Sequence, residues 1–331
     1  MSEASSADGK LGATSSGAIC LAVFRPNAVL LRRQLESIRE QSHRDWRCHV
    51  GIDGSNAGAA RLIHEIIGDD DRFVVHEYEN NVGFYRNFER IIRQIDPRVE
   101  WFALADQDDY WYPDKLSLLV AELGVETTMA ASGQARIVDS EGGTLGFSNR
   151  RDVSLAGLMF DNQVTGSLAM FRTSVLATAL PFPAPTHAAY HDHWLGVVAS
   201  SAGRVTFLAD IVQDYVQHDS NVLGEEQDLR VLGRLMRLRN RATNDEPILR
   251  YLAVHRWNWR VRMARRILAS NADRDRLAAV IPIADGRISW RLLWLAAGLC
   301  LAGEVSPLRA TGLLAGSLAW RRQDIEEDTT S

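Results

Sequence analysis

Three carboxylates within four positions form the strongest chemical signal in the sequence. Asp106, Asp108 and Asp109 lie in the segment 105–116, which reads ADQDDYWYPDKL. Carboxylates held this close repel one another, and a bound divalent cation offsets the repulsion. Mg²⁺ or Mn²⁺ binds one or two carboxylates together with substrate phosphates, so the ion would neutralise a leaving diphosphate. A solvated acidic loop is the alternative for a bare DxD pair, but the longer DQDDxWxPDKL pattern is specific.

A second polar group lies further along the chain, in the segment 191–194, which reads HDHW. Asp192 offers a carboxylate that can act as a general base toward a hydroxyl group. A zinc site is the competing interpretation, because His187 and His191 are four residues apart and His193 is close by. The sequence lacks the Glu of a helical HExxH pair and a third ligand at the usual spacing, which disfavours zinc.

The elements that must position these residues follow an α/β pattern. From residue 18 to about 122, short apolar runs alternate with amphipathic stretches, which predicts a central, mostly parallel mixed sheet flanked by helices. Asn27 is expected to cap the first helix. Because ligands of open α/β sheets bind at the carboxyl ends of strands, the acidic cluster lies where chemistry is expected. The predicted strands are 18–24, 46–52, 73–78 and 100–105, with helices at 59–67 and 84–95; beyond Pro113 we expect strands near 135–139, 167–171 and 205–208 and a helix near 192–200.

The segment 105–116 resembles the signature of glycosyltransferase family 2, in particular its rhamnosyltransferase-like branch, whose members build bacterial polysaccharides. The resemblance covers roughly residues 18–224. It implies the A-type glycosyltransferase (GT-A) fold, in which the amino-terminal half binds a nucleotide sugar and the carboxyl-terminal half binds the acceptor. The implied activity is an inverting, metal-dependent transfer of a sugar, with rhamnose as the guess, from a dTDP- or UDP-linked donor to a glycan or lipid-linked glycan.

Carried over by position, the resemblance implies how the donor is bound. Asp106 would approach the donor ribose, Asp108 would hold the metal and through it the diphosphate, and Asp109 would be a supporting carboxylate. His218, in the segment YVQHDSN, resembles a family histidine that completes the metal–diphosphate site, although a lone His is more often structural. The residues implied for the nucleotide sugar are Phe24, Arg25, Asp53, Arg86, Asp106 and Gln107, and those implied for the metal are Asp108, Asp106 and His218.

Two positions depart from the family pattern. Arg25 stands where such enzymes usually carry the Asn of a Tyr-Asn-like pair, and Ile52 replaces the first carboxylate of an Asp-Asp-Gly-Ser motif. Asp53 keeps the carboxylate expected to recognise the base. Arg86 would face the diphosphate, or it would simply be a solvated Arg on a helix. The departures put the identity of the nucleotide in doubt, but not nucleotide binding.

On the acceptor side, Asp192 matches the catalytic Asp of the family. It would deprotonate the acceptor hydroxyl while that oxygen attacks the anomeric carbon opposite the leaving group, which inverts the configuration. Trp194 offers a face on which a sugar could stack, or it is a core residue. Gly166, in the VTGS segment, indicates either close backbone approach to the sugar or a simple turn. The implied acceptor and sugar contacts are Gly166, His191, Trp194 and Asp109.

The carboxyl-terminal region differs in charge from the rest of the chain. The net charge is −5, yet residues 225–322 carry about 18 Arg and about 9 acidic residues. The segment 288–303 is apolar but shorter than the roughly 20 residues of a spanning helix. Its Trp290 and Trp294, with the nearby Trp257 and Trp259, fit a helix in the membrane interface; packing on the catalytic domain or on a dimer partner is the alternative.

These patterns predict three regions: a disordered leader at 1–17 without the apolar core of a signal peptide, a GT-A domain at 18–224, and a basic helical region at 225–331 that contacts a membrane surface or mediates oligomerisation. Three widely spaced cysteines suit a reducing compartment, so we expect a cytoplasmic protein, peripheral on the inner face of the membrane. A catalytically silent binding or assembly protein and a nucleotidyltransferase are the rivals. The latter generally has a Gly-rich phosphate loop, which is not visible in 18–35, and no nucleic-acid recognition motif is present.

Overall fold

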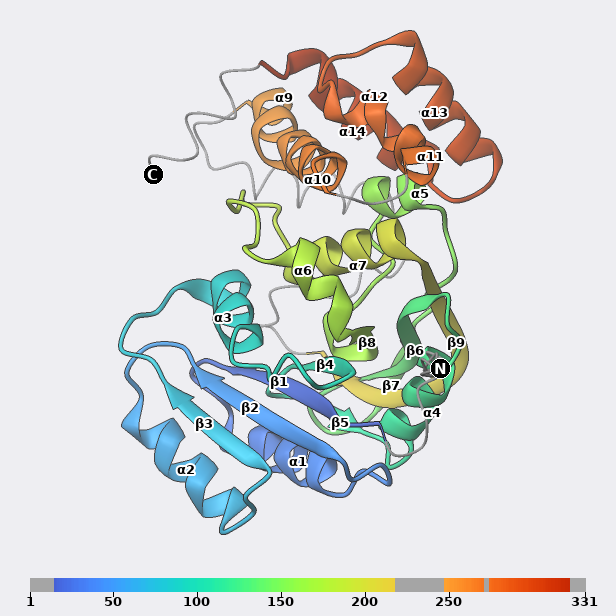
Figure 1. Cartoon of the computed structure of the whole chain (residues 1–331). Helices are drawn as coiled ribbons and strands as arrows, with labels where there is room; N and C mark the ends of the chain where they lie inside the picture. The colour runs from blue at the N-terminus through green and yellow to red at the C-terminus, as the bar shows by residue number, and fades with distance from the viewer. Residues whose placement is uncertain (1–14, 218–246, 271–273, 322–331) are drawn as a thin grey trace, which may run out of the picture. The chain divides into compact units, whose positions relative to one another are not determined.

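A computed structural model describes residues 15–217, 247–270 and 274–321 (Figure 1). These residues form two compact units. The first contains the described residues up to Arg150, together with Thr165–Leu176 and Gly203–Val216; the second contains Arg151–Val164, Ala177–Ala202 and the described residues from Gln217 onward. Most of the predicted leader, the predicted boundary at 224 and His218 lie outside the described residues.

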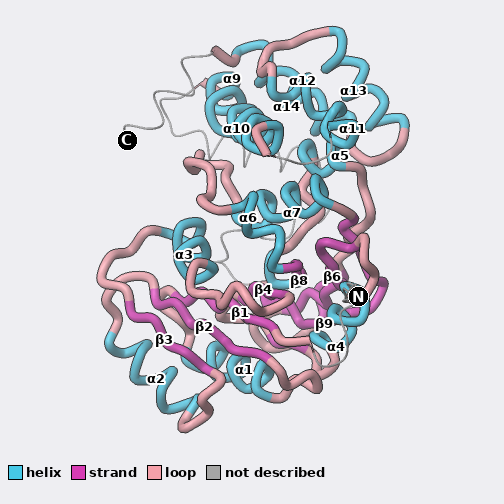
Figure 2. Tube along the Cα trace, viewed as in Figure 1, coloured by secondary structure: helices cyan, strands magenta, loops and turns pink. Residues whose placement is uncertain are grey.

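The first unit is built, within the described residues, on a nine-stranded mixed sheet (Figure 2). Its amino-terminal half is parallel, as predicted: β1 pairs with both β2 and β4, and β2 pairs with β3. β8 then joins antiparallel to β4, and the sheet continues through β6 and β9 to β5, with β7 on β6. The strands are β1 (Gly17–Val23), β2 (Trp46–Ile52), β3 (Phe73–Glu77), β4 (Trp101–Ala105), β5 (Tyr110–Trp111), β6 (Thr128–Val138), β7 (Thr144–Phe147), β8 (Ala169–Arg172) and β9 (Arg204–Val216).

Helices cover both faces of the parallel half of the sheet. Apolar side chains of α1 (Ala28–Arg39), α2 (Ala57–Ile67) and α4 (Lys115–Leu123) form one core with alternate residues of β1, β2 and β4. Because side chains alternate along a strand, the other face remains for α3 (Gly83–Ile92). It packs so closely on Gly51 that a Cβ there would lie 2.3 Å from Ile91. Figure 1 shows α1 and α2 on one side of the sheet and α3 on the other.

Local signals explain where several elements begin. Asn27 caps α1 as predicted, since its side chain accepts hydrogen bonds from the backbone N–H groups of Val29 and Leu30. Two of the predicted strands beyond Pro113, at 135–139 and 205–208, were too short: β6 begins at Thr128, and β9 runs for 13 residues. β9 contains polar residues that a simple apolar pattern does not reveal, such as Gln213 and Asp214, and both are hydrogen-bonded to side chains of neighbouring elements.

The second unit is helical in its described residues. Its longer helices are α7 (His191–Ala202), α10 (Asn258–Leu268), α13 (Trp290–Leu301) and α14 (Pro307–Ala319), and its shorter ones are α5 (Leu155–Phe160), α9 (Ile248–Tyr251), a π-helical turn (Leu252–Trp257), α11 (Arg274–Leu277) and α12 (Ile281–Ala284). α6 (Leu176–Ala179) begins at the boundary between the two units. Among the described residues, no helix combines the length and the apolar character that crossing a bilayer requires.

The interior of the second unit corrects one expectation about the basic region. Trp257 and Trp259 are fully buried, so they are core residues and not part of an interfacial surface. Two arginines of α10 are also buried: Arg260 donates to the carbonyl of Met159, and Arg262 donates to that of Ala184. Part of the basic character of this region therefore satisfies backbone carbonyls inside the unit.

Candidate functional site

The acidic cluster follows β4 directly, at the carboxyl end of a central parallel strand. Asp106 and Asp108 are half-buried, whereas Asp109 is 1% exposed. Burial raises the pKa of Asp109 well above its ordinary value, and the negative charges of Asp106 and Asp108 raise it further. The three carboxylates therefore act on one another electrostatically, as the sequence predicts for this segment.

The carboxylate oxygens of this loop are suitable ligands for a hard divalent cation. Asp106 and Asp108 offer carboxylate oxygens, and Mg²⁺ is commonly held by one or two carboxylates with substrate oxygens completing its coordination. In the described part of the chain, His, Cys, Asp and Glu residues do not gather into a group of three that could hold a metal ion. The two-carboxylate arrangement requires no such group.

Gln107 ties the acidic loop to the end of β1. Its side-chain amide accepts a hydrogen bond from the backbone N–H of Phe24 at 2.8 Å and donates one to the carbonyl of Phe24 at 3.0 Å. Arg25 follows with a φ of 45°, a left-handed conformation that is uncommon outside glycine, and its guanidinium carbon lies 5.0 Å from the centre of the Phe24 ring. The structure thus brings Phe24, Arg25 and Gln107 to the acidic loop.

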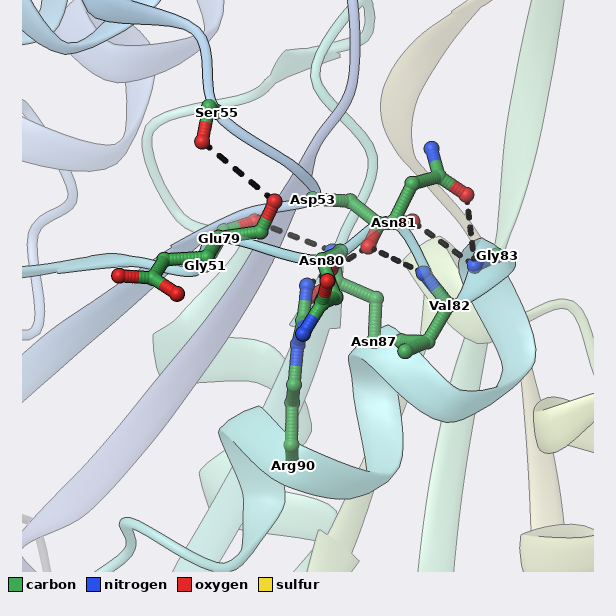
Figure 3. Close-up of polar contacts among 10 residues, drawn as sticks. All are labelled: Gly51, Asp53, Ser55, Glu79, Asn80, Asn81, Val82, Gly83, Asn87 and Arg90. Carbon is green, nitrogen blue, oxygen red and sulfur yellow. Dashed lines mark hydrogen bonds and ion pairs between the residues drawn. The ribbon is translucent and has the colours of Figure 1, made fainter.

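Asp53 follows β2 and is bonded to the start of α3 (Figure 3). One carboxylate oxygen accepts from the N–H of Val82 at 2.8 Å and from Arg90 at 2.6 Å, and the other accepts from the N–H of Gly83 at 2.9 Å. Asp53 is only 4% exposed. A carboxylate with these contacts holds the first turn of a helix in place and offsets its unpaired N–H groups.

The two arginines of α3 have different partners. Arg86, predicted to face the diphosphate, forms an ion pair with Glu89 and is half-buried. Arg90, which the sequence reasoning missed, binds Asp53 and stacks with its guanidinium carbon 3.6 Å from the centre of the Tyr78 ring. Its position one helical turn after Arg86 was the available signal, because residues four apart lie on one helix face.

A buried polar network lies beneath the acidic loop. Asp109 accepts a hydrogen bond from Gln213 at 2.8 Å, and Gln213 in turn accepts one from Lys115 at 2.5 Å. The Lys115 ammonium also donates to the carbonyl of Ser167 and lies 3.8 Å from the Trp111 ring centre. Burial lowers the pKa of Lys115 well below its ordinary value. The network joins the loop after β4 to α4 and β9 within one unit.

The predicted turn at Gly166 is also part of this region. Gly166 is buried and begins a single 3-10 turn, Gly166–Leu168, which leads into β8. The next residue, Ser167, accepts a hydrogen bond from Gln213 through its hydroxyl and one from Lys115 through its carbonyl. Ser167 and Gln213 are thus supporting residues that the sequence reasoning did not identify.

Asp192 lies in the second unit, in the first turn of α7. It is 6% exposed, and its Oδ1 accepts hydrogen bonds from the N–H of His193 at 2.5 Å and from the side-chain amide of Asn162 at 3.2 Å. The N-terminus of a helix favours negative charge, so this position stabilises the ionised carboxylate that a general base requires. Asn162 was not predicted; the side-chain oxygen of the same residue accepts from the N–H of Val164.

The three aromatic residues of the HDHW segment are buried beside Asp192. Burial lowers the pKa of His191 to about 3, so this ring is neutral at physiological pH. His193 bonds through Nε2 to the carbonyl of Leu158. Trp194 is fully buried, and its indole donates to the carbonyl of Ala179 at 2.9 Å. A ring without exposed surface cannot stack on a sugar, so the structure favours the core interpretation of Trp194.

Comparison with solved structures identifies the fold. The chain is similar to S. aureus TarS 1–349 solved with UDP-GlcNAc, with a TM-score of 0.55 and 13% identity over 90% of this chain and 78% of that one. It is also similar to the mannosyltransferase PcManGT from Pyrobaculum calidifontis solved with GDP-Man and Mn²⁺, with a TM-score of 0.51 and 16% identity over 91% and 84% of the two chains. The curled sheet flanked by helices is the GT-A fold, which confirms the predicted fold class.

The family is shown by sequence. The model of glycosyl transferase family 2 matches residues 19–195, more than half of the chain, and the protein belongs to this family. A search of curated proteins finds no match. The family and the fold together support a glycosyltransferase.

Proposed function

We propose that this protein is a metal-dependent, inverting glycosyltransferase that moves a sugar from a nucleoside diphosphate donor to a hydroxyl group of a glycan or lipid-linked glycan. The observation that carries the proposal is the acidic loop after β4, held by Gln107 on one side and by the Asp109 network on the other, in a family 2 chain. TarS has been solved with UDP-GlcNAc and PcManGT with GDP-Man and Mn²⁺, which supports a nucleotide-sugar donor and a divalent cation.

In this proposal the diphosphate and the ribose of the donor have residues that bind them. Asp108, with Asp106, would hold Mg²⁺ or Mn²⁺, and the ion would supply positive charge to the leaving diphosphate. Asp106 would also approach the ribose, and its neighbour Gln107 holds the backbone of Phe24 through two hydrogen bonds. Arg86 contributes positive charge from α3, and the location of His218 outside the described residues leaves its proposed metal contact to experiment.

Asp192 is the proposed catalytic base. Its carboxylate takes the proton of the acceptor hydroxyl as that oxygen bonds to the anomeric carbon and the bond to the diphosphate breaks. Asn162 orients the carboxylate by donating a hydrogen bond to Oδ1. Gly166 and His191 are the proposed acceptor-side contacts. A dTDP- or UDP-linked deoxyhexose such as rhamnose is the first donor to test, and bacterial polysaccharide synthesis is the proposed setting.

The test separates donor binding from transfer. A thermal-shift screen of nucleoside diphosphates and their sugars, each with Mn²⁺ or Mg²⁺, should raise the melting temperature for one nucleotide, because a ligand that binds only the folded state stabilises it. With the donor so identified, Asp192→Asn should keep the thermal shift and lose transfer by about 10²–10⁴-fold.

Two results would contradict the proposal. Undiminished turnover by Asp192→Asn would remove Asp192 from the mechanism. A wild-type chain that binds no nucleotide in the presence of metal, or binds one without consuming its sugar in transfer or hydrolysis, would favour the catalytically silent binding protein. The thermal-shift control is Asp96→Asn, since the Asp96 side chain is 41% exposed and is paired with Arg98, which is 88% exposed.

A further inference from the structure

The outward face of α13 is apolar along its whole length. Trp290 is 79% exposed, Trp294 is 75% exposed and Leu301 is 90% exposed. At about 100° per residue these three side chains fall within about 40° of arc, so they form a single ridge along the helix. Ala297 also lies on this ridge and is exposed. The opposite side of the helix packs into the second unit through its buried residues, Leu292, Ala296 and Leu299.

This arrangement differs from that of an ordinary surface helix. A helix that packs one apolar side against its own unit normally presents charged and polar residues on the other side. In α13 the only charged residue is Arg291, at the edge of the ridge. From Gly286 to Gly303 the chain carries two arginines, Arg287 and Arg291, both exposed, and no acidic residue. Adjacent exposed apolar side chains of this size mark an interaction surface.

The ridge is held rigidly at both ends. At the start of α13, the Ser289 hydroxyl accepts a hydrogen bond from the N–H of Leu292. After its end, the Glu304 carboxylate accepts from the hydroxyl of Ser154 at 2.6 Å and from its N–H at 2.9 Å. Arg151 donates to the carbonyl of Gly303 at 2.6 Å. Glu304 is thus engaged with the unit. The exposed Asp285 stands two residues before Arg287, so residues 285–303 carry two arginines against one carboxylate and keep a net positive charge.

We propose that α13 docks this protein onto the surface of an anionic phospholipid bilayer, with Trp290, Trp294 and Leu301 inserted at the headgroup level and Arg287 and Arg291 facing the lipid phosphates. Tryptophan favours the membrane–water interface because its ring is apolar and its N–H is polar. The positive charge beside the ridge complements the negative surface of such a membrane. With 12 residues, α13 is about 18 Å long, against about 30 Å for the hydrocarbon core, so it would lie along the interface.

The docking surface is independent of the proposed transfer reaction. Vesicle binding is measured on the full chain without a donor, a metal or an acceptor, so its outcome and the outcome of the activity tests can be told apart. The probe is large vesicles of phosphatidylcholine with about one third phosphatidylglycerol, at low salt because exposed charges are screened within about 10 Å at 0.1 M ionic strength. Pure phosphatidylcholine vesicles measure the apolar part of the interaction alone.

Cosedimentation should show that the wild-type chain binds the anionic vesicles more strongly than the neutral ones. Trp290→Ser/Trp294→Ser should lower the affinity by at least about tenfold, because the ridge loses its largest apolar side chains. Arg287→Gln/Arg291→Gln should lower the affinity for anionic vesicles by about fivefold for each Arg and leave the affinity for neutral vesicles unchanged. The matched control is Leu145→Ser/Phe147→Ser on β7, where both side chains are exposed by about half; it should bind like the wild type.

Each other outcome overturns the proposal. If the wild-type chain does not bind anionic vesicles at low salt, or if the double Trp variant binds as tightly while melting at the wild-type temperature, α13 is not a lipid-docking helix. Sedimentation velocity addresses a second copy of the chain as the occupant. A dimer that Trp290→Ser/Trp294→Ser dissociates, combined with no vesicle binding, would show that the ridge pairs with itself.

Discussion

The loops after β2 and β4 both place carboxylates at the carboxyl ends of parallel strands, and they use them differently. Asp53, after β2, is 4% exposed and accepts hydrogen bonds from Val82, Gly83 and Arg90. Asp106 and Asp108, after β4, stay half-buried, and their charges raise the pKa of the buried Asp109. The first loop attaches a helix to the sheet, whereas the second concentrates negative charge at the surface.

The difference shows how a carboxylate that stabilises the fold can be distinguished from one that is needed for activity, when both lie at the end of a strand. A buried carboxylate that accepts from a helix N-terminus and a guanidinium is stabilised by its own chain, so its removal should cost folding free energy. Carboxylates held close together repel one another and destabilise the chain until a cation offsets their charges, so their removal should cost activity instead. Asp53 is therefore expected to influence donor binding mainly by fixing the loop 80–83 and α3.

The largest effect expected from this difference between the two loops is a loss of activity. Asp108→Asn removes the proposed metal-binding carboxylate, and we expect turnover with the preferred nucleotide sugar to fall by about 10²–10³-fold or more. In EDTA the melting temperature should stay the same or rise, because one like charge has been removed from the loop. Steady-state kinetics with Mn²⁺ and a thermal melt check both parts. A variant that is active but unfolds at a lower temperature would make Asp108 an architectural residue like Asp53.

The second effect is on stability. Asp53→Ala leaves the Arg90 guanidinium and two helix N–H groups without their carboxylate, so the free energy of unfolding should fall by about 2–4 kcal/mol, less than for a fully buried pair because Arg90 is partly exposed. Urea denaturation monitored by circular dichroism measures the change. Asp96→Ala is the matched control: Asp96 pairs with Arg98 on the surface, and its loss should leave the transition almost unchanged.

A double-mutant cycle with Arg90→Met measures how far the stabilising effect of Asp53 depends on Arg90. If the ion pair between Asp53 and Arg90 carries the effect, Arg90→Met should lower the free energy of unfolding much less in the Asp53→Ala variant than in the wild type. Full additivity of the two substitutions would show that Asp53 and Arg90 stabilise the chain independently. An Asp53→Ala variant as stable as the wild type with a weaker nucleotide affinity would instead assign Asp53 a direct role in recognising the base.

The sequence predicted the parallel half of the sheet well because each of its elements carries its own local signal. The β2 range agrees residue for residue, and Asn27 caps α1 through the hydrogen bonds that its residue type predicts. The other half of the sheet, in which parallel and antiparallel pairs are mixed, was predicted poorly. β9 runs from Arg204 to Val216, and its polar residues are satisfied by partners distant in sequence, such as Asp109 for Gln213 and Arg136 for Asp214. Long-range pairing of this kind leaves no local pattern.

The candidate site shows the same limit. The motif identified the acidic loop, and the structure brings Phe24 and Gln107 to it through two hydrogen bonds. The residues that support the site were missed. Arg90 and Asn162 belong to no motif, Ser167 ends the VTGS segment without being predicted as a site residue, and all three act through tertiary contacts. Among tryptophans, residue type alone could not separate the buried Trp194 and Trp257 from the exposed Trp290, since each of the three has a polar or charged residue directly beside it in the sequence.

The smallest expected effect is a difference in pH dependence between the two regions. On β2, His49 Nδ1 lies 3.1 Å from His76 Nε2 on β3, and burial, followed by the charge of His76, lowers the pKa of His49 to about 4. The folded state thus prefers the neutral ring, so this contribution to stability is complete above about pH 6.5 and is lost as the pH falls toward 4. Asp109 has the opposite sign: its raised pKa gives a contribution that is complete at low pH and is lost as the pH rises above the carboxyl's ordinary value.

Thermal melts at pH 7.5, 6.0 and 5.0 in EDTA test this contrast. Between pH 7.5 and 5.0 the loss of stability should be smaller in His49→Gln than in the wild type, by on the order of 1 kcal/mol because solvent reaches part of the ring. Asp109→Asn should show the reverse relation, gaining stability relative to the wild type as the pH rises. Parallel curves for His49→Gln and the wild type would mean that His49 has a similar pKa in the folded and unfolded chains. If Asp109→Asn lost stability relative to the wild type as the pH rose, Asp109 would be a paired carboxylate of the Asp53 kind, and the contrast between the two strand ends would disappear.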